Sequence, residues 1–365
     1  MILDIDLIAL TDYVRAPTIR AGVDGKPHDR RDAPTKIDKR QRDRQNKMEI
    51  VVHPLQRILS VVPGINLLEA LRSNDVPVSY SCLAGRCGTC RCRIVEGTER
   101  ADNDDGYVLA CQTFVTEPCT VEIPEPDEIV VHTARIIKAT VVAIEDQTHD
   151  IQRVRLKPAK PLSFSPGQYA QLQFTPDHIR PYSMAGLPGD EELEFHVRRV
   201  AGGRVTGYIA DTLKAGDTVR VSGPLGSAYL RRKHEGPMLC VAGGTGLAPI
   251  LSIVRGVIAQ GMRNPIHLYF GVRSERDVYG RAWLQELQRQ HANLHVHVVL
   301  TSGEATGCRR GLVTEAIAQD WHSLEGFRAY LCGAPPMVEA MTLLARQMGV
   351  KPGQIYADAF YASGT

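Results

Sequence analysis

Four cysteines offer the chemistry that this sequence states most clearly. Cys82, Cys87 and Cys90 follow one another in the string SCLAGRCGTC, and Cys111 comes later in LACQ. This spacing, Cys-x4-Cys-x2-Cys with a fourth cysteine further along, is that of a plant-type [2Fe–2S] cluster. The small residues between the cysteines let the backbone bend around the irons and bring N–H groups close to the sulfur atoms. The pattern therefore predicts a metal centre that carries single electrons, with these thiolates as ligands.

Zinc and disulfide bonds are the alternatives for these cysteines. Zinc sites favour pairs of closely spaced ligands, which this pattern lacks. Disulfide bonds need an oxidising compartment, whereas the N-terminal MILDIDLIAL carries Asp4 and Asp6 where an export signal would be basic and then apolar. The total of nine cysteines is odd and suits a reducing cytoplasm. We therefore expect a cytoplasmic protein in which Cys92 and Cys119 are core residues rather than ligands.

Length, charge and hydropathy narrow the possibilities further. A chain of 365 residues can form two or three domains. Its 43 Lys+Arg are nearly balanced by 41 Asp+Glu, which removes the general case for nucleic-acid binding. No apolar run reaches the roughly 18 residues that a membrane span needs. Residues 15–47 are poor in large apolar side chains and lack periodicity, so we expect residues 1–47 to be a disordered leader or to follow from a start codon assigned too far upstream.

Residues 48–124 predict a small α+β domain around the cysteines. Strands are expected at EIVVHP, ILSVVP, RCRIVEG, YVLACQTF and CTVEIP. A helix is expected after Asn66, because Glu69 follows it at the spacing of a capping box. The proline- and acid-rich residues 125–133 indicate a linker.

Residues 134–232 predict an antiparallel barrel of about six strands, because short alternating runs are separated by glycine-containing turns. The string RPYS offers Arg180 to neutralise a pyrophosphate, Tyr182 to lie on an isoalloxazine ring and Ser183 to reach the flavin N5 atom. The glycines before VTGYIADTL open a short helix whose N–H groups can approach a phosphate. The candidate flavin-binding residues are Arg180, Pro181, Tyr182, Ser183, Gly203, Arg204, Val205 and Thr206.

Residues 233–365 alternate apolar strands with helices, which is typical of a parallel sheet covered on both faces. After the first of these strands, Gly244, Thr245 and Gly246 lead into a helix. Two glycines here permit a tight turn and close approach of the backbone to a dinucleotide pyrophosphate. The turn does not match G-x-G-x-x-G, so the ordinary Rossmann fingerprint is not met. The segment predicts an α/β nucleotide-binding domain.

These features together resemble one family. The chain is similar to the reductase components of aromatic-ring-hydroxylating dioxygenase systems through the strings SYSCLAGRCGTCRCR, RPYSMAGLP, GGRVT, GPMLCVAGGTGLAP, YLCGAPPMVEA and IYADAFY. Those reductases are ferredoxin–NADP reductase-like flavoproteins fused to a plant-type ferredoxin. The resemblance covers residues 48–361 and implies a β-grasp ferredoxin domain, a six-stranded FAD-binding barrel and an NAD(P)-binding parallel-sheet domain.

The resemblance also implies roles for residues that the patterns alone leave open. Cys332 matches a cysteine close to the nicotinamide ring, where it would act with Ser183 in catalysis, and Phe360 matches an aromatic residue near the flavin. The interval between Cys90 and Cys111 is shorter than in most plant-type clusters, but the LACQ context still fits the fourth ligand.

The implied activity is that of a ferredoxin–NAD(P)H reductase. Electrons would pass from NAD(P)H through FAD and the [2Fe–2S] cluster to a Rieske-type or other small ferredoxin that serves the oxidation of naphthalene-like hydrocarbons. We expect a monomer. The nearest alternative is the reductase of a two-component aromatic monooxygenase, which would reduce the oxygenase directly. A redox-sensing module and a zinc-stabilised binding protein are alternatives of other classes.

The preference between NADH and NADPH depends on groups near the adenosine ribose. An acidic side chain would hold the ribose 2′-hydroxyl, whereas arginines would accept a 2′-phosphate. Arg273, Glu275, Arg276 and Asp277 crowd the loop after the second strand of the nucleotide-binding segment. We therefore expect NADH to be used and NADPH to be an alternative.

Overall fold

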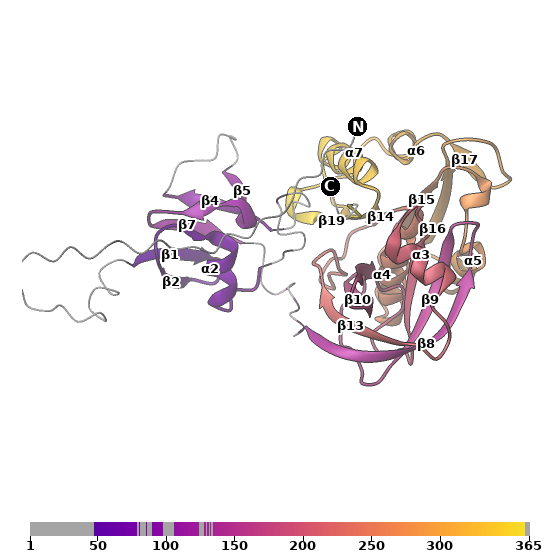
Figure 1. Cartoon of the computed structure of the whole chain (residues 1–365). Coiled ribbons are helices and arrows are strands. Elements are labelled where there is room, and N and C mark those ends of the chain that lie inside the picture. Colours follow the sequence, from indigo (N-terminus) through magenta and orange to yellow (C-terminus); the bar gives the residue numbers. More distant parts are fainter. Residues whose placement is uncertain are drawn as a thin grey trace, which may run out of the picture. The chain divides into compact units, whose positions relative to one another are not determined.

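The computed structural model describes residues 47–78, 80, 85, 90–97, 106–123, 128, 130, 132 and 134–361 (Figure 1). Its strands form a five-stranded sheet, two six-stranded sheets and a two-stranded sheet. Separate clusters of buried apolar side chains lie within residues 48–123, within the first six-stranded sheet, and on the two faces of the second. The multidomain fold predicted from the sequence is therefore confirmed.

The first domain surrounds the described cysteines. It contains β1 (Met48–His53), β2 (Arg57–Val61), β3 (Ile65–Asn66), α2 (Leu67–Ser73), β4 (Arg91–Glu96), β5 (Tyr107–Leu109), η1 (Ala110–Gln112), β6 (Phe114–Val115) and β7 (Cys119–Glu122). The sheet order is β2-β1-β7-β4-β5, and β1 pairs antiparallel with β2 but parallel with β7. Asn66 caps α2 by accepting the Glu69 N–H at 3.3 Å, as predicted. Cys92 and Cys119 are 1% and 5% exposed, which confirms them as core residues.

The second domain is a nearly closed antiparallel barrel. It contains β8 (Arg135–Asp146), β9 (Ile151–Pro158), β10 (Tyr169–Thr175), β11 (His178–Ser183), β12 (Leu193–Arg198), α3 (Arg204–Asp211) and β13 (Thr218–Leu225). The strand order is β11-β10-β13-β8-β9-β12. An isolated bridge between Met184 and Phe195 joins the two outer strands and brings the sheet close to closure. Alternate residues of each strand fill the barrel interior, as the sequence alternation predicts.

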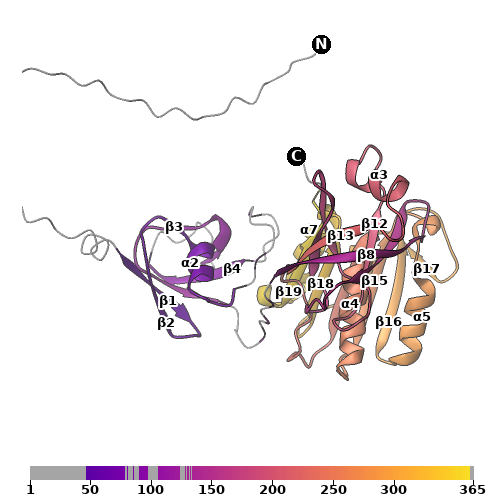
Figure 2. The same ribbon diagram turned by 60° about the horizontal axis from the view of Figure 1, so that its bottom comes forward.

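The third domain is a parallel sheet with helices on both faces. It contains β14 (Met238–Gly243), η3 (Gly244–Gly246), α4 (Leu247–Ala259), β15 (Ile266–Val272), η4 (Glu275–Asp277), α5 (Arg281–Gln290), β16 (Leu294–Leu300), β17 (Cys308–Arg310), α6 (Val313–Asp320), β18 (Arg328–Gly333), α7 (Pro335–Gln347), η5 (Pro352–Gln354) and β19 (Ile355–Ala359). The strand order is β17-β16-β15-β14-β18-β19 (Figure 2). Cys240 belongs to the core beneath α4 and α5, whereas its neighbour Val241 belongs to the core beneath α6 and α7. This alternation explains why the strands are apolar throughout.

Among the described residues, no helix is long and apolar enough to cross a membrane.

Candidate functional site

The structure brings two of the predicted cluster ligands together. The backbone N–H of Cys111 points at the Cys90 sulfur at 3.4 Å, and the Gln112 side-chain amide lies 3.6 Å from the Cys111 sulfur. Gly85, in the cysteine loop, has a φ of 75°, and a Cβ there would lie 2.7 Å from the Gln112 side chain. Cys82 and Cys87 lie outside the described residues. N–H groups directed at both described sulfurs fit anionic thiolate ligands, which such hydrogen bonds stabilise.

The RPYS residues, 180–183, form the second part of β11 in the barrel. Tyr182 has a hydroxyl group that is buried and has no hydrogen-bond partner among the described residues, and burial raises its pKa. An unpartnered buried hydroxyl is expected where a bound group supplies the missing partner. The Arg180 guanidinium is half-buried and donates only to the adjacent Ile179 carbonyl, at 3.0 Å, in the hydrogen bonds that the structure records. Pro181 is exposed. These features fit a flavin with its pyrophosphate.

The start of α3 offers backbone N–H groups as hydrogen-bond donors to a ligand. Gly203 is the residue before the helix and provides no side-chain cap, so the first N–H groups of α3 remain available to a ligand. A Cβ at Gly203 would lie 2.5 Å from the Thr206 hydroxyl and 3.0 Å from the Val200 carbonyl, so glycine is required for this close approach. Arg204 is exposed, whereas the Val205 side chain is in the barrel core. Val205 can therefore contribute only through its backbone.

The glycine turn after β14 is tightly fitted against the end of β18. A Cβ at Gly246 would lie 2.1 Å from the Cys332 carbonyl oxygen. Gly244 has a φ of 55°, and a Cβ there would lie 2.9 Å from the Arg198 guanidinium. Both glycines are therefore needed for the backbone path, and Thr245 between them is half-buried. Sequence analysis did not single out Arg198, because the arginine comes from a barrel strand far from the turn in sequence.

Three polar side chains meet where β11 lies next to the ends of β18 and β19. The Ser183 hydroxyl donates to the Asp358 carboxylate at 3.4 Å. Burial raises the pKa of Asp358 to about 6, against the opposing effect of this hydrogen bond. Burial, followed by the negative charge of Asp358, raises the pKa of the Cys332 thiol well above its usual range. The half-buried Phe360 is anchored nearby, where its N–H donates to the Gly333 carbonyl at 2.9 Å.

No pattern in the sequence singles out Asp358, although the surrounding string IYADAFY carries part of the family resemblance. A single aspartate in a strand gives no spacing signal, and its partner Ser183 is 175 residues away. The available signal was an acidic residue in an otherwise half-buried strand.

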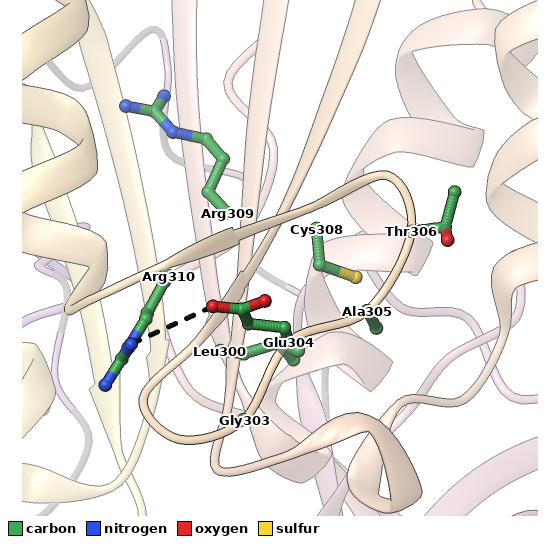
Figure 3. Close-up of a pocket in the computed structure, with 8 residues that line it drawn as sticks. All are labelled: Leu300, Gly303, Glu304, Ala305, Thr306, Cys308, Arg309 and Arg310. Atoms are coloured by element: carbon green, nitrogen blue, oxygen red, sulfur yellow. Dashed lines mark ion pairs between the residues drawn. The ribbon is translucent and has the colours of Figure 1, made fainter.

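A cavity of about 510 Å³ opens at the carboxyl end of β16 (Figure 3). It is lined by Leu300, Gly303, Glu304, Ala305, Thr306, Cys308, Arg309 and Arg310. In Figure 3 the Arg310 side chain points towards Glu304, with which it forms an ion pair at 3.9 Å. Arg309 instead pairs with Asp320 of α6. Arg281 donates to the Cys308 sulfur at 3.0 Å. The cavity thus offers both signs of charge to a polar ligand.

The loop after β15, which the sequence offered for coenzyme choice, is partly occupied by its own contacts. Asp277 accepts hydrogen bonds from the N–H and hydroxyl of Ser274, at 2.9 and 2.7 Å. These bonds lower the pKa of Asp277 against the effect of burial. Arg273, Glu275 and Arg276 are exposed. Only these three remain open to a ligand.

Family models match successive parts of the chain. A 2Fe-2S iron-sulfur cluster binding domain matches residues 50–116, an oxidoreductase FAD-binding domain matches residues 138–229, and an oxidoreductase NAD-binding domain matches residues 240–342. The chain is 60% identical over 327 residues to the ferredoxin–NAD(P)+ reductase component of the naphthalene 1,2-dioxygenase/salicylate 5-hydroxylase systems of a Ralstonia species, covering 87% of this chain and all of the relative. The chain belongs to this reductase family.

A second relative and two solved structures agree. The reductase is 57% identical to the corresponding component of the naphthalene 1,2-dioxygenase system of Pseudomonas putida, over 87% of this chain and all of the relative. Among solved structures it resembles the Amycolatopsis cytochrome P450 reductase GcoB, with a TM-score of 0.67, 34% identity, and coverage of 86% and 98% of the two chains. The ferredoxin reductase of carbazole 1,9a-dioxygenase follows, with a TM-score of 0.62, 26% identity and the same coverage.

The cofactors and activity expected from the sequence are therefore confirmed. The reductase binds a [2Fe–2S] cluster, FAD and NAD(P)H, and carries electrons from NAD(P)H towards an oxygenase system. When bound, the flavin supplies the conversion of a hydride, which delivers two electrons, into single-electron transfers.

Proposed function

We propose that the reductase passes single electrons to a small ferredoxin, Rieske-type or similar, of a dioxygenase system for naphthalene-like aromatic hydrocarbons. The observation that carries this proposal is the identity of 60% and 57% to two relatives that are both named as reductase components of naphthalene 1,2-dioxygenase systems. Reductases of monooxygenases are more distant, at 30% for propane 2-monooxygenase and 28% for phenol 2-monooxygenase. Direct donation to an oxygenase is the second candidate.

The cluster ligands in this proposal are Cys82, Cys87, Cys90 and Cys111. The contacts around the two described cysteines support it, because N–H groups point at both sulfurs. The matched iron–sulfur domain also spans all four positions. The flavin pyrophosphate is assigned to Arg180 and to the N–H groups of Arg204, Val205 and Thr206 at the start of α3, where Gly203 permits a close approach. The isoalloxazine ring is assigned to Tyr182, whose hydroxyl has no protein partner among the described residues.

The nicotinamide ring is assigned to the place where Ser183, Cys332 and Asp358 meet. Hydride transfer needs stacking and accurate placement more than acid–base catalysis. The buried Cys332 thiol is held in its protonated form and offers a neutral, compact surface. Ser183 and Asp358 provide the polar groups that orient a ligand, and Phe360 follows directly after β19.

The remainder of the dinucleotide is assigned to the carboxyl edge of the parallel sheet. Ligands of such sheets bind outside the carboxyl ends of the strands. A path from the Gly244–Gly246 turn at β14 leads past β15 to the cavity at the end of β16, following the strand order. There the Glu304 carboxylate can accept a hydrogen bond from a ribose 2′-hydroxyl, and the Arg310 guanidinium can donate hydrogen bonds to a 2′-phosphate. Both NADH and NADPH are therefore substrates in this proposal.

The reductase is placed in the cytoplasm as a monomer. The odd number of cysteines, nine, and the predicted role of four of them as thiolate ligands support a reducing compartment. Sedimentation of the purified holoenzyme tests the monomer.

The first test is an anaerobic titration with NADH in which the flavin and iron–sulfur absorption bands are followed separately. Both bands should bleach. Cys111→Ser should remove the iron–sulfur band while NADH still bleaches the flavin, and Cys119→Ala, which removes a core thiol, should behave like the wild type. Loss of the cluster in Cys119→Ala but not in Cys111→Ser would refute the ligand assignment.

The second test identifies the acceptor. The reductase is mixed with NADH and with either the ferredoxin or the oxygenase of its own system, and the reduction of each is followed by its absorption. The proposal expects rapid reduction of the ferredoxin and slow reduction of the oxygenase unless ferredoxin is added. Equally rapid reduction of the oxygenase alone would favour the monooxygenase-type alternative.

A further inference from the structure

One strand of the flavin barrel has two functional faces. Along β12, the alternating residues Leu193, Phe195 and Val197 fill the barrel interior. The residues between them therefore point to the other face of the strand. Glu194 and His196 lie on this other face, where they contact the third domain. Both are therefore 7% exposed or less. A barrel strand thus supplies buried polar groups to the nucleotide-binding domain.

Glu194 is held as a carboxylate within this contact. Arg153 of β9 donates to one of its oxygens at 2.6 Å, and Arg255 of α4 lies 3.9 Å from the other. Burial alone would raise the pKa of Glu194, but the hydrogen bonds from His196 and Arg153 outweigh it and bring the pKa to about 2. An ionised carboxylate can only accept hydrogen bonds.

This ionised carboxylate fixes the proton on His196. The imidazole Nε2 lies 3.0 Å from the Glu194 carboxylate, so Nε2 must carry the proton. Burial, and the nearby Arg255 and Arg153, lower the pKa of His196 against the effect of Glu194, so the ring is neutral. Its Nδ1 atom is then an acceptor.

The acceptor on His196 determines the direction of the next hydrogen bond. The Tyr279 hydroxyl lies 3.0 Å from Nδ1 and 3.4 Å from the Gly244 carbonyl oxygen. A phenol has one proton, and both acceptors lie within its reach, so the hydroxyl donates a shared, three-centre hydrogen bond whose stronger part goes to His196 Nδ1. The weaker part of this shared hydrogen bond is donated to the Gly244 carbonyl of the glycine turn. The chain of groups runs from Glu194 through His196 and Tyr279 to the turn.

We propose that Tyr279 is a positioning residue, which holds the Gly244–Gly246 turn in register with the flavin barrel through His196 and Glu194. The inference rests on the proposed binding of the dinucleotide at this turn. The contact between Tyr279 and His196 joins the two domains at a buried point, since Tyr279 is 3% exposed and His196 is 4% exposed. Trp283 packs on the His196 ring at a centroid distance of 5.8 Å and restricts its rotation.

Other contacts along the same boundary keep the domains together without Tyr279. Ser252 of α4 donates to the Gly186 carbonyl at 2.7 Å, and Arg255 donates to the Ala185 carbonyl at 2.9 Å. His149 of the turn between β8 and β9 lies 3.9 Å from Asp277. Removal of the Tyr279 hydroxyl should therefore shift the turn locally rather than separate the domains.

A local shift of the turn should affect hydride transfer more than binding. Rates of reactions between positioned groups fall by about a hundredfold for a misplacement of about 1 Å. Binding of the dinucleotide uses many contacts along the sheet edge and is less sensitive to one of them. The signature of a positioning residue is thus a slower reduction of flavin at saturating NADH with a nearly unchanged dissociation constant.

The test compares Tyr279→Phe with a matched variant, Tyr269→Phe, by rapid mixing of the holoenzyme with NADH. Tyr269 is also a buried tyrosine of the third domain, but its hydroxyl bonds to Asp320 and Trp321 on the opposite face of the sheet. We expect Tyr279→Phe to slow flavin reduction at saturating NADH by about tenfold or more, with less than about a threefold change in the dissociation constant, and Tyr269→Phe to change neither.

Two further variants distinguish an error in the positioning role from an error in the proposed binding site. His196→Gln combined with Tyr279→Phe should be no slower than the slower single variant, because both act through one chain of contacts. Gly246→Ala should abolish reduction by NADH if the dinucleotide binds at the turn at all. If Gly246→Ala reacts normally, the proposed binding site is wrong. If Gly246→Ala fails to react but Tyr279→Phe reacts at the wild-type rate, or only binds NADH more weakly, the positioning role is wrong.

Discussion

Glu194, which is buried, and Asp358, which is half-buried, have pKa shifts of opposite sign because their partners differ. Glu194 faces two arginines and a histidine, and its pKa is about 2. Asp358 has only the Ser183 hydroxyl as a recorded side-chain partner, so burial dominates and its pKa is about 6. Glu194 therefore keeps its charge at every working pH, whereas Asp358 changes charge within the working range. Groups of the second kind are typical of functional sites.

The raised pKa of Asp358 predicts a pH-dependent rate. The carboxyl is neutral below about pH 6 and ionised above it. Loss of hydride leaves the nicotinamide ring positively charged, so an ionised carboxylate nearby should favour the reaction. We expect flavin reduction by NADH to become several-fold faster between pH 5 and pH 7, with a midpoint near 6, and Asp358→Asn to lack this step. Rapid mixing at a series of pH values measures it.

The same group predicts a change in stability with a definite sign. The folded pKa of Asp358 lies above the unfolded value of 3.8, so ionisation opposes folding as the pH rises from about 4 through 6. The free energy of unfolding of Asp358→Asn minus that of the wild type should therefore increase over this range, by roughly 1–3 kcal/mol. Denaturant melts at pH 4.5 and pH 7 give this difference. A difference independent of pH would contradict the raised pKa.

At the scale of elements, the connection from β14 to α4 depends on the absence of side chains. The backbone of Gly246 is so close to the end of β18 that a Cβ would lie 2.1 Å from the Cys332 carbonyl oxygen and 2.5 Å from its carbonyl carbon. Backbone atoms of a central strand cannot move aside cheaply, because the strand pairs on both sides. The turn, the end of β18 and the start of α4 therefore form one rigid unit.

Gly246→Ala should disrupt this unit. Overpacking against the backbone is expected to destabilise the nucleotide-binding domain by about 1–3 kcal/mol and to displace the turn. Reduction of flavin by NADH should be lost, whereas reduction by dithionite, which needs no dinucleotide site, should be retained. Gly353→Ala is the matched control, since a Cβ there would meet nothing within 4 Å. Normal reduction by NADH in Gly246→Ala would contradict the proposed binding of the dinucleotide at this turn.

At the scale of the whole molecule, the order of domains follows the order of electron transfer in reverse, from the cluster domain through the barrel to the nucleotide-binding domain. The segment between the first two domains is fastened at defined points. Glu128 pairs with Arg328 at 2.9 Å, and their side chains are 12% and 5% exposed. The N–H of Val130 donates to the Tyr229 hydroxyl at 2.8 Å. These contacts attach Glu128 and Val130 to the two later domains and so tether the preceding cluster domain to them.

Glu128→Ala should loosen this tether. It leaves the buried Arg328 without its carboxylate partner, which costs about 3 kcal/mol in comparable buried pairs. We expect a lower thermal midpoint and slower electron transfer from flavin to cluster, with an unchanged rate of flavin reduction by NADH. The exposed Glu235 provides the control Glu235→Ala. Rapid mixing that resolves the flavin and cluster bands measures both rates, and an unchanged second rate would show that the tether is not limiting.

Deletion of residues 1–47 should leave the activity intact. The relative that is 60% identical is covered in full by 87% of this chain, and the matched domains begin at residue 50. Residues 15–47 are poor in large apolar side chains and should contribute little to a folded core, so the truncated reductase should keep its activity within about twofold. NADH-dependent reduction of the acceptor ferredoxin measures this, and a large loss would give the segment a function.

The sequence by itself determined the parts of this reductase whose geometry is local. The cysteine spacing, the Asn66 cap, the strand alternation of the barrel and the turn at Gly244 each depend on neighbours a few residues apart, so a linear pattern records them. Only the tertiary structure decided which distant side chains meet. Ser183 reaches Asp358 across 175 residues, and His196 reaches Tyr279 across 83. Such contacts leave no periodic signal, because a single polar residue gains its role from the strand that packs opposite it.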